Sequence, residues 1–448
     1  MPAAGGARPR PSAARAAGRA PPGGDVRGAA RPAAPSGSDA DDDSDTPYES
    51  SDEEERAARH EWLQRSRPLS SKERAALAPE MDAERARAAA SGVGAKVAQG
   101  SSSAERRAPA GAYELKRRIA FDLGGAEPLA GEYSPDGGIV AVACRDGSAL
   151  AFNASSGAAV STFSSAGAPA GTAATALAFV PGRSVCVVGN SAGELHCWHT
   201  TSRAAAQQQA EPLREEGSSP SALAFARLSG RAAFASVGTD GALRLYDAAG
   251  FALRSRLHAG ADSQQAGHSN RAFAVAFVGD GDAVCVTAGC DGRAVLWDAR
   301  AGGAVASVHG VQVCGQALDG SRGEHAIIVG SWREQAALQE WDLRRGLATR
   351  TLTHAGARLY SLDASALGRD GVIATGGADV RIIEYETGDV LAWDGCVAPA
   401  PSENAAAGEG DERPPATHAV RMRPGAIATD ELLICTAKEA YAAPIERG

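Results

Sequence analysis

The chain has 448 residues, of which 44% are hydrophobic and 22% charged, and its formal net charge is −9. These proportions are ordinary for a globular protein, and 53 Gly with 23 Pro predict an ordered part rich in turns. No run approaches the roughly 18 consecutive apolar residues that a membrane span requires. The eight cysteines form no CxxC pair, which argues against a zinc knuckle and favours free thiols in a reducing compartment.

Charge is unevenly distributed along the first part of the chain. Residues 1–38 are rich in Arg, residues 39–55 carry ten acidic side chains and no basic one, and residues 56–118 are again basic. A segment with such charge blocks and few branched apolar residues cannot build a core. We therefore expect residues 1–112 to be a disordered charged tail and residues 113–448 to form the ordered domain.

The start of this tail is rich in Arg and Ala and resembles an organelle transit peptide. Four prolines between Pro9 and Pro22 interrupt the amphipathic helix that such a signal prefers. We favour a GC-rich coding bias as the origin of this composition. The expected location is therefore cytoplasmic or nuclear, with the transit peptide as the alternative.

Two features of the tail suggest regulated contacts. Trp62, in a short predicted helix, is a candidate docking residue, although a solvated transient helix explains it equally well. Ser38, Ser50 and Ser51 each precede an acidic residue by three positions, which resembles the target pattern of acidophilic casein-type kinases. Each phosphate would add about −1.5 to −2 charges, so phosphorylation of this acidic block could control the exposure of Trp62.

From residue 130 onward, one pattern recurs: a short apolar strand, a polar turn, and a second strand that ends in an aromatic residue. The clear copies span 142–153, 235–247, 286–298 and 374–386, and two degenerate copies span 187–199 and 329–342. Their aromatic residues recur at intervals of 44 to 51 residues, which indicates the blades of a propeller. Asp-Gly pairs in three of the copies predict tight hairpins.

Six copies are visible, and three further strand-like runs follow at 418–423, 431–437 and 439–445. This last unit lacks one strand, whereas a strand-like segment at 114–123 lies before the first copy. We therefore predict an all-β, seven-bladed β-propeller in which the N-terminal strand completes the last blade. Such closure removes an open sheet edge. A six-bladed ring with a ragged C-terminus is the alternative.

The segment 286–298 resembles a blade of the WD-repeat β-propeller family, because Gly267-His268 stands 30 residues before Trp297-Asp298. Trp341-Asp342 is a second dipeptide of this kind. The segment 308–320 is similar to a WD-repeat subgroup without a settled activity, so it refines the family resemblance and implies no function.

The resemblance implies a buried relay of hydrogen bonds in which His, Ser or Thr, Asp and Trp lock each blade. Blade three has no matching His. The candidates are His268, Thr287, Asp291 and Trp297 in blade four; His354, Thr375, Asp379 and Tyr385 in blade six; and Ser236, Asp240 and Tyr246 in blade three. We interpret these polar residues as structural rather than catalytic.

The sequence offers little for catalysis. It contains no Gly-rich phosphate loop, nucleophile elbow or HExxH motif. His196, Cys197 and His199 suggest a metal site, but only Cys197 and His199 would share one face of a strand, and zinc requires at least three protein ligands. We expect no enzymatic activity, no metal and no other cofactor.

Loops carried by a rigid ring are the usual place for binding residues. Trp332 and Arg333, in the enlarged turn of the fifth copy, have the composition of an interaction hot spot. Alternatively, Trp332 packs against the neighbouring blade. We expect a non-enzymatic scaffold or adaptor that binds proteins or peptides through its loops and its tail, without a small-molecule substrate or a membrane partner.

Two other functions remain open at this point. The basic tail blocks favour a chromatin- or nucleic-acid-associated factor, but residues 119–448 contain 25 basic and 36 acidic side chains, which disfavours phosphate binding by the propeller. The other alternative is a propeller hydrolase with a site in the central channel.

Overall fold

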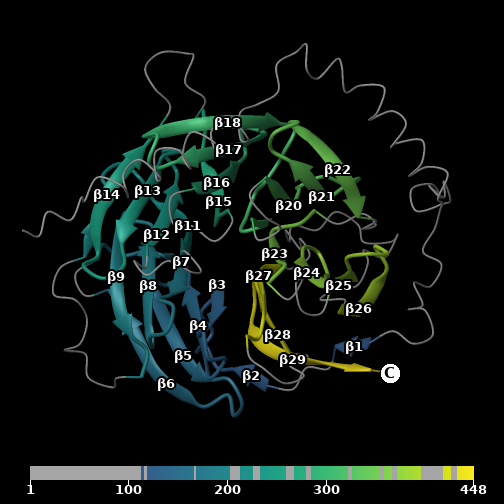
Figure 1. Cartoon of the computed structure of the whole chain (residues 1–448). Helices are drawn as coiled ribbons and strands as arrows, with labels where there is room; N and C mark the ends of the chain where they lie inside the picture. Colours follow the sequence, from purple (N-terminus) through teal and green to yellow (C-terminus); the bar gives the residue numbers. More distant parts are fainter. Residues whose placement is uncertain are drawn as a thin grey trace, which may run out of the picture. The chain divides into compact units, whose positions relative to one another are not determined.

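The computed structural model describes the chain from residue 113 onward, with short gaps (Figure 1). These residues form strands, turns and loops, and none of the described segments is a helix long and apolar enough to cross a membrane. The described ranges are 113–115, 119–165, 168–201, 212–225, 233–258, 267–278, 284–320, 325–352, 358–365, 371–394, 417–424 and 431–447.

The first five blades are separate antiparallel sheets, each built from four consecutive strands. Their strands are β3 (Pro128–Tyr133), β4 (Ile139–Cys144), β5 (Ser148–Asn153) and β6 (Ala159–Ser164); β7 (Ala174–Phe179), β8 (Val185–Asn190), β9 (Glu194–His199) and β10 (Leu213–Arg214); β11 (Pro220–Phe225), β12 (Ala233–Gly238), β13 (Leu243–Asp247) and β14 (Ala252–Leu257); β15 (Ala272–Phe277), β16 (Val284–Gly289), β17 (Arg293–Asp298) and β18 (Gly303–His309); and β19 (Leu318–Asp319), β20 (Ala326–Gly330), β21 (Leu338–Asp342) and β22 (Leu347–Leu352).

Blades six and seven share one larger sheet. Blade six contains β23 (Ser361–Asp363), β24 (Val372–Gly376), β25 (Val380–Glu384) and β26 (Val390–Asp394), and blade seven contains β27 (Thr417–Met422), β28 (Glu431–Thr436) and β29 (Ala440–Arg447). The innermost strands contact one another in the order β3, β7, β11, β15, β19, β23 and β27, and β27 contacts β3 again. The fold is therefore a closed, seven-bladed β-propeller, as the sequence predicts, and the blades surround a central axis in Figure 1.

The N-terminal segment closes the ring with two short strands rather than the single strand expected at 114–123. Strand β2 (Ile119–Phe121) pairs antiparallel with β29 and supplies the missing outer strand of blade seven. Strand β1 (Tyr113–Leu115) pairs antiparallel with the end of β29 and parallel with β26 of blade six. The segment thus completes blade seven through β2 and joins blade seven to blade six through β1.

Tight hairpins give the blades their regular geometry. Gly147, Gly241 and Gly292, the glycines of the predicted Asp-Gly turns, have φ values of 89°, 67° and 74°. Only glycine adopts this left-handed backbone region without strain. At Gly147 a Cβ atom would also lie 2.3 Å from the carbonyl oxygen of Thr172, so this turn has no room for a side chain.

The core lies between neighbouring blades, and the six repeated aromatic residues anchor it. Each is at most 7% exposed: Phe152, Trp198, Tyr246, Trp297, Trp341 and Tyr385. Trp297 of blade four belongs to one buried apolar cluster with Ala233 and Ala235 of blade three. Small residues on one blade therefore make room for a large aromatic side chain from the next, as close packing requires.

Candidate functional site

In blade four the expected side chains form one continuous hydrogen-bond relay. Trp297 Nε1 donates to Thr287 Oγ1 at 2.7 Å, and Thr287 Oγ1 lies 2.7 Å from His268 Nε2. His268 Nδ1 lies 3.0 Å from Asp291 Oδ2. Because a carboxylate only accepts, His268 Nδ1 is the donor in this contact. The relay connects the strands of the blade to the loop that enters it.

Asp291 also fixes that loop directly. The backbone N–H of Ser269 donates to Asp291 Oδ2 at 3.0 Å. Burial acts to raise the pKa of Asp291, but the hydrogen bond and charge of His268 outweigh it and lower the pKa below its usual range. The side chains of His268 and Asp291 are 0% and 2% exposed, so their contact is shielded from solvent, as is typical of a structural contact.

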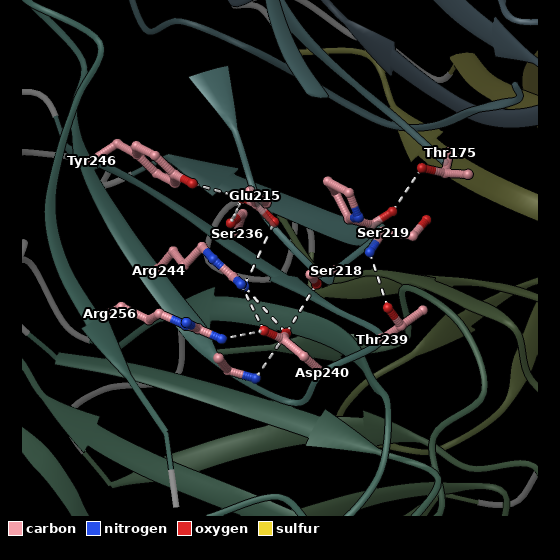
Figure 2. A network of polar contacts seen from close by, with 12 residues as sticks. Thr175, Glu215, Ser218, Ser219, Ser236, Thr239, Asp240, Arg244, Tyr246 and Arg256 are labelled. Atoms are coloured by element: carbon pink, nitrogen blue, oxygen red, sulfur yellow. Dashed lines mark hydrogen bonds and ion pairs between the residues drawn. The ribbon is translucent and has the colours of Figure 1, made fainter. Parts of the chain in front are cut away.

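Blade three makes the equivalent connection through Glu215, a residue that the sequence analysis did not select (Figure 2). Tyr246 donates its hydroxyl hydrogen to Glu215 Oε1 at 2.8 Å, and Ser236 donates to the same oxygen. Glu215 lies in the loop that enters blade three, and its side chain is 0% exposed. A buried carboxylate therefore occupies the place that His268 has in blade four.

Arg244 balances the negative charge of this cluster. Its guanidinium lies 3.7 Å from Glu215 Oε2 and 2.6 Å from Asp240 Oδ2. Ser218 donates to Asp240 Oδ1 at 2.9 Å, and Arg256 Nη2 lies 3.1 Å from Asp240 Oδ2. Asp240 thus holds the entering loop, as Asp291 does in blade four, while Arg244 joins the two carboxylates.

The two carboxylates of blade three have opposite pKa shifts. Burial raises the pKa of Glu215, and the hydrogen bond from Ser236 and the charge of Arg244 offset only part of this effect. Burial also acts to raise the pKa of Asp240, but Arg244 outweighs it and the pKa falls to about 2. The difference arises because Arg244 contacts Asp240 directly and Glu215 only at longer range.

Blade six departs from the expected relay because its central hairpin has a different register. In blade four Trp297 lies opposite Cys285, and Cys285 stands two residues before Thr287 in its strand. In blade six the N–H of Tyr385 donates to the carbonyl oxygen of Gly371, four residues before Thr375. The aromatic residue is therefore displaced along the strand relative to the hydroxyl residue.

The displaced Tyr385 makes a contact between blades instead. Its hydroxyl group donates to Glu340 Oε2 of blade five at 2.5 Å. Asp379 is 2.5 Å from Arg381 Nη2 and accepts a hydrogen bond from Trp393 Nε1 at 2.9 Å. His354, the fourth candidate of this blade, lies outside the described residues.

Blade five lacks a hydroxyl residue at the relay position. Trp341 lies opposite Ile327, so Val329 has the place that Thr287 has in blade four. Among the described residues, Trp341 Nε1 is buried without a hydrogen-bond acceptor. This blade is held by packing instead, since Trp341, Ile327 and Val329 belong to one buried apolar cluster.

The enlarged turn of blade five, residues 331–337 between β20 and β21, presents the indole of Trp332 to solvent. Trp332 is 38% exposed, and the guanidinium carbon of Arg358 lies 4.6 Å from its ring centroid. Arg358 Nη2 also lies 2.9 Å from Glu334 Oε1. We call these three residues the Trp332 surface.

The side chain of Arg333 is bonded to the backbone of the preceding segment, whereas that of Trp332 is exposed. Its Nη2 atom donates to the carbonyl oxygen of Gly310 at 2.5 Å, and the N–H of Trp332 donates to the carbonyl oxygen of Gln312 at 2.9 Å. These bonds tie the turn to the segment that enters blade five. Arg333 therefore supports the turn, and Arg358 is the cation that contacts the indole.

The same turn contains a strained backbone position. Ala336 has a φ of 53°, in the left-handed region that non-glycine residues rarely adopt. Such strain persists only where surrounding contacts hold it, and it occurs preferentially at functional sites. The strain at Ala336 therefore marks this turn as a candidate binding element.

A network of polar side chains crosses the central channel. Arg421 of β27 donates from Nε to Glu132 Oε2 of blade one at 3.0 Å and from Nη2 to Gln316 Oε1 at 2.7 Å. Gln316 Nε2 in turn donates to the carbonyl oxygen of Ser221 in blade three at 3.3 Å. We call this chain of contacts the cross-channel network. It connects blades seven, one, five and three through the middle of the ring.

The metal hypothesis receives no geometric support from the described part of the chain. There, no three His, Cys, Asp or Glu side chains gather as metal ligands would. His196 lies 3.4 Å from Glu194 Oε2 and Cys197 is buried, as core packing requires. The tail residues Trp62, Ser38, Ser50 and Ser51 lie outside the described residues.

Glu215 and Arg421 are the principal residues that sequence reasoning missed. One signal did exist for Glu215: it precedes Ser236 by 21 residues, close to the 19 residues between His268 and Thr287. The family pattern has His at this position and Glu215 is a carboxylate, so the resemblance to the WD-repeat family did not suggest it. For Arg421 no local signal exists, because its partners come from distant blades.

Comparison with models of known protein families gives no match, and comparison with curated proteins gives none either. The class of the protein therefore rests on its architecture. Seven radial blades and a ring closed by the N-terminal segment define a β-propeller.

Proposed function

We propose that this protein is a non-enzymatic, WD-repeat-type scaffold or adaptor that binds a partner protein at the Trp332 surface. The observation that carries the proposal is the arrangement of Trp332, Arg358 and Glu334 on a rigid blade. Trp and Arg are the residues most enriched at interaction hot spots. A large exposed apolar ring on an otherwise well-packed blade favours contact with another protein.

The geometry supports a surface that needs little rearrangement to bind. Arg358 lies over the indole, and its ion pair with Glu334 limits its motion. The backbone hydrogen bond from Trp332 to Gln312 and the side-chain hydrogen bond from Arg333 to Gly310 hold the turn in place. A preorganised surface loses less conformational entropy on binding, which favours affinity.

The channel chemistry favours a scaffold over the hydrolase alternative. Its carboxylates already have structural partners: Glu132 is 3.0 Å from Arg421, and Asp363 accepts the N–H groups of Met422 and Ser365, each at 2.7 Å. A general acid or base has to be available to substrate. The acidic balance of the propeller likewise disfavours direct nucleic-acid binding. A cytoplasmic or nuclear location belongs to the same proposal.

The test is affinity purification of the tagged full-length chain from cells, followed by mass spectrometry. The wild type should retain a reproducible set of proteins that Trp332→Ala loses. Leu253→Ala is the matched control, because Leu253 is also an exposed apolar side chain, at 53%, but lies in blade three. Circular dichroism should show that both variants remain folded. Identical partner sets for the wild type and Trp332→Ala would refute the proposed surface.

A further inference from the structure

Two cysteines stand at the surface where blade four adjoins blade five. Cys290 is exposed, in the turn between β16 and β17, and Cys314 is half-buried, in the segment that leads from β18 to β19. Both are free thiols. Neither belongs to the relay of blade four or to the Trp332 surface, so the packing of the blades does not explain why both are thiols.

A backbone hydrogen bond joins the two segments directly before the cysteines. The N–H of Val313 donates to the carbonyl oxygen of Gly289 at 3.4 Å. Cys290 is the residue after Gly289, and Cys314 is the residue after Val313, so the two cysteines flank this bond. A disulfide requires Cα atoms within about 7 Å of each other, which residues flanking a hydrogen bond between two backbone segments can satisfy.

The electrostatics of the pair agree with this placement. Burial raises the pKa of the Cys314 thiol, and the charge of Cys290 raises it further. Such effects fade within about 10 Å in salt solution, so the two thiols are near neighbours. Cys314 carries less thiolate than an ordinary cysteine at neutral pH, whereas Cys290 is the thiol that solvent reaches. Cys290 is therefore the one that meets an oxidant first.

The other described cysteines are shielded from oxidants. Four of them are 0% exposed and the fifth is 6% exposed: Cys144, Cys186, Cys285, Cys435 and Cys197. Burial raises the pKa of Cys144 and that of Cys197 to about 12, so both are thiols rather than thiolates at neutral pH. Buried cysteines of this kind are inert. Among the described residues, Cys290 and Cys314 are thus the neighbouring thiols that an oxidant can reach.

We propose that Cys290 and Cys314 form a reversible disulfide when the chain meets hydrogen peroxide. The thiolate of Cys290 attacks one oxygen of the peroxide, the O–O bond breaks, and the departing hydroxide takes up the proton that the thiol lost; Cys290 becomes a sulfenic acid. The sulfur of Cys314 then attacks the sulfur of Cys290, the S–O bond breaks, and hydroxide leaves with the Cys314 proton as water. Two thiols and one peroxide thus give one disulfide and two waters.

The disulfide ties the hairpin of blade four to the segment that enters blade five. That segment includes Gln312, whose carbonyl oxygen accepts the N–H of Trp332. An exposed disulfide is also more easily reduced than a buried structural one, which makes the bond reversible. The two thiols do not contact the indole of Trp332 through any bond described above, so the disulfide site holds whether or not the Trp332 surface binds a partner.

The test treats the reduced full-length chain with hydrogen peroxide, blocks the remaining thiols and maps the cysteines by mass spectrometry of a non-reduced tryptic digest. Fragment spectra distinguish Cys290 from Cys285, which lies in the same tryptic peptide. Peptides linked through Cys290 and Cys314 should be at least about ten-fold more abundant than any other linked pair, because the buried cysteines do not meet the oxidant. Dithiothreitol should separate them. The five buried cysteines are internal controls and should remain thiols.

Variants test the order of the two steps. Cys314→Ser leaves the sulfenic acid of Cys290 without a partner, so dimedone, which reacts with sulfenic acids, should label Cys290. Cys290→Ser should give neither a disulfide nor a label at Cys314. Trp332→Ala should form the disulfide as the wild type does, which separates this site from the proposed partner surface. Circular dichroism identifies any variant that fails to fold, and the wild-type map decides in that case. Free thiols at both positions after oxidation, or bonds from either cysteine to Cys396 or to a second chain, would overturn the proposal.

Discussion

Arg421 Nε lies 3.0 Å from Glu132 Oε2, although 289 positions separate the two residues in the sequence. Arg421 belongs to the last blade and Glu132 to the first, so their ion pair spans the seam at which the ring closes. A second contact reinforces it: Tyr133 donates its hydroxyl hydrogen to Glu431 Oε1 at 3.0 Å. The seam is therefore held by contacts between side chains as well as by strand pairing.

Removing the cation should weaken this seam. Arg421→Leu removes the cation that Glu132 and Gln316 contact, and loss of these partly buried contacts should lower the free energy of unfolding by about 1–3 kcal/mol. The measurement is urea unfolding of Arg421→Leu, Glu132→Leu and the double variant. Because the residues contact each other, the double variant should be more stable than the sum of the single effects predicts. Strictly additive effects would contradict the coupling.

The relay of blade four should be structural. Asp291→Ala removes the acceptor of His268 Nδ1 and of the Ser269 N–H. Loss of a buried partner of this kind should lower the free energy of unfolding by about 1–3 kcal/mol. Asp146→Ala, at the exposed equivalent turn of blade one, is the control and should change stability by less than about 0.5 kcal/mol. Wild-type stability of Asp291→Ala together with lost partner binding would indicate a functional role instead.

Glu215 should give the chain an unusual pH dependence. Its pKa in the folded state is raised by burial above the ordinary value of 4.5, so folding binds the proton more tightly. Its contribution to stability is present below the unfolded pKa and is lost as the pH rises through the folded pKa. Asp240 acts in the opposite sense: its contribution is present above the ordinary value of 3.8 and is lost as the pH falls towards about 2.

Glu215→Gln isolates the first effect. The free energy of unfolding of the variant, minus that of the wild type, should increase with pH above about 4.5, because the variant has no carboxyl group to ionise. Urea unfolding between about pH 4 and pH 8 measures it. A constant difference for Glu215→Gln would mean that its ionisation is not coupled to folding.

The strained turn of blade five offers a stabilising substitution. Ala336→Gly should raise the free energy of unfolding by about 0.5–1 kcal/mol, because glycine adopts a positive φ without the steric cost that alanine has. Thermal unfolding measures the gain. Ala337→Gly, at the next residue of the turn and buried, should destabilise the chain. Lower stability of Ala336→Gly would show that the conformation of Ala336 is not strained.

The sequence predicts the parts of this fold that depend on local pattern. Trp297 and the other repeated aromatics mark the blades because each must fill the same gap against a neighbouring blade, and Asp-Gly turns mark hairpins because few residues tolerate a positive φ. Tyr385 has the right spacing in the sequence but lies out of alignment, since the register of its hairpin depends on the whole blade. The contact between Arg421 and Gln316 exists only after the ring closes, so no local pattern could reveal it.

The central claim is that the N-terminal segment closes the propeller, and thermal unfolding of truncated chains tests it most directly. Removing residues 1–110 keeps β1 and β2 and should leave the melting temperature unchanged. Removing residues 1–118 deletes β1 alone and should give an intermediate value. Removing residues 1–124 exposes the edge of β29 and the hydrophobic surface that Phe121 covers, and should lower the melting temperature by at least about 5 °C. Equal melting temperatures for all three truncated chains would contradict closure by this segment.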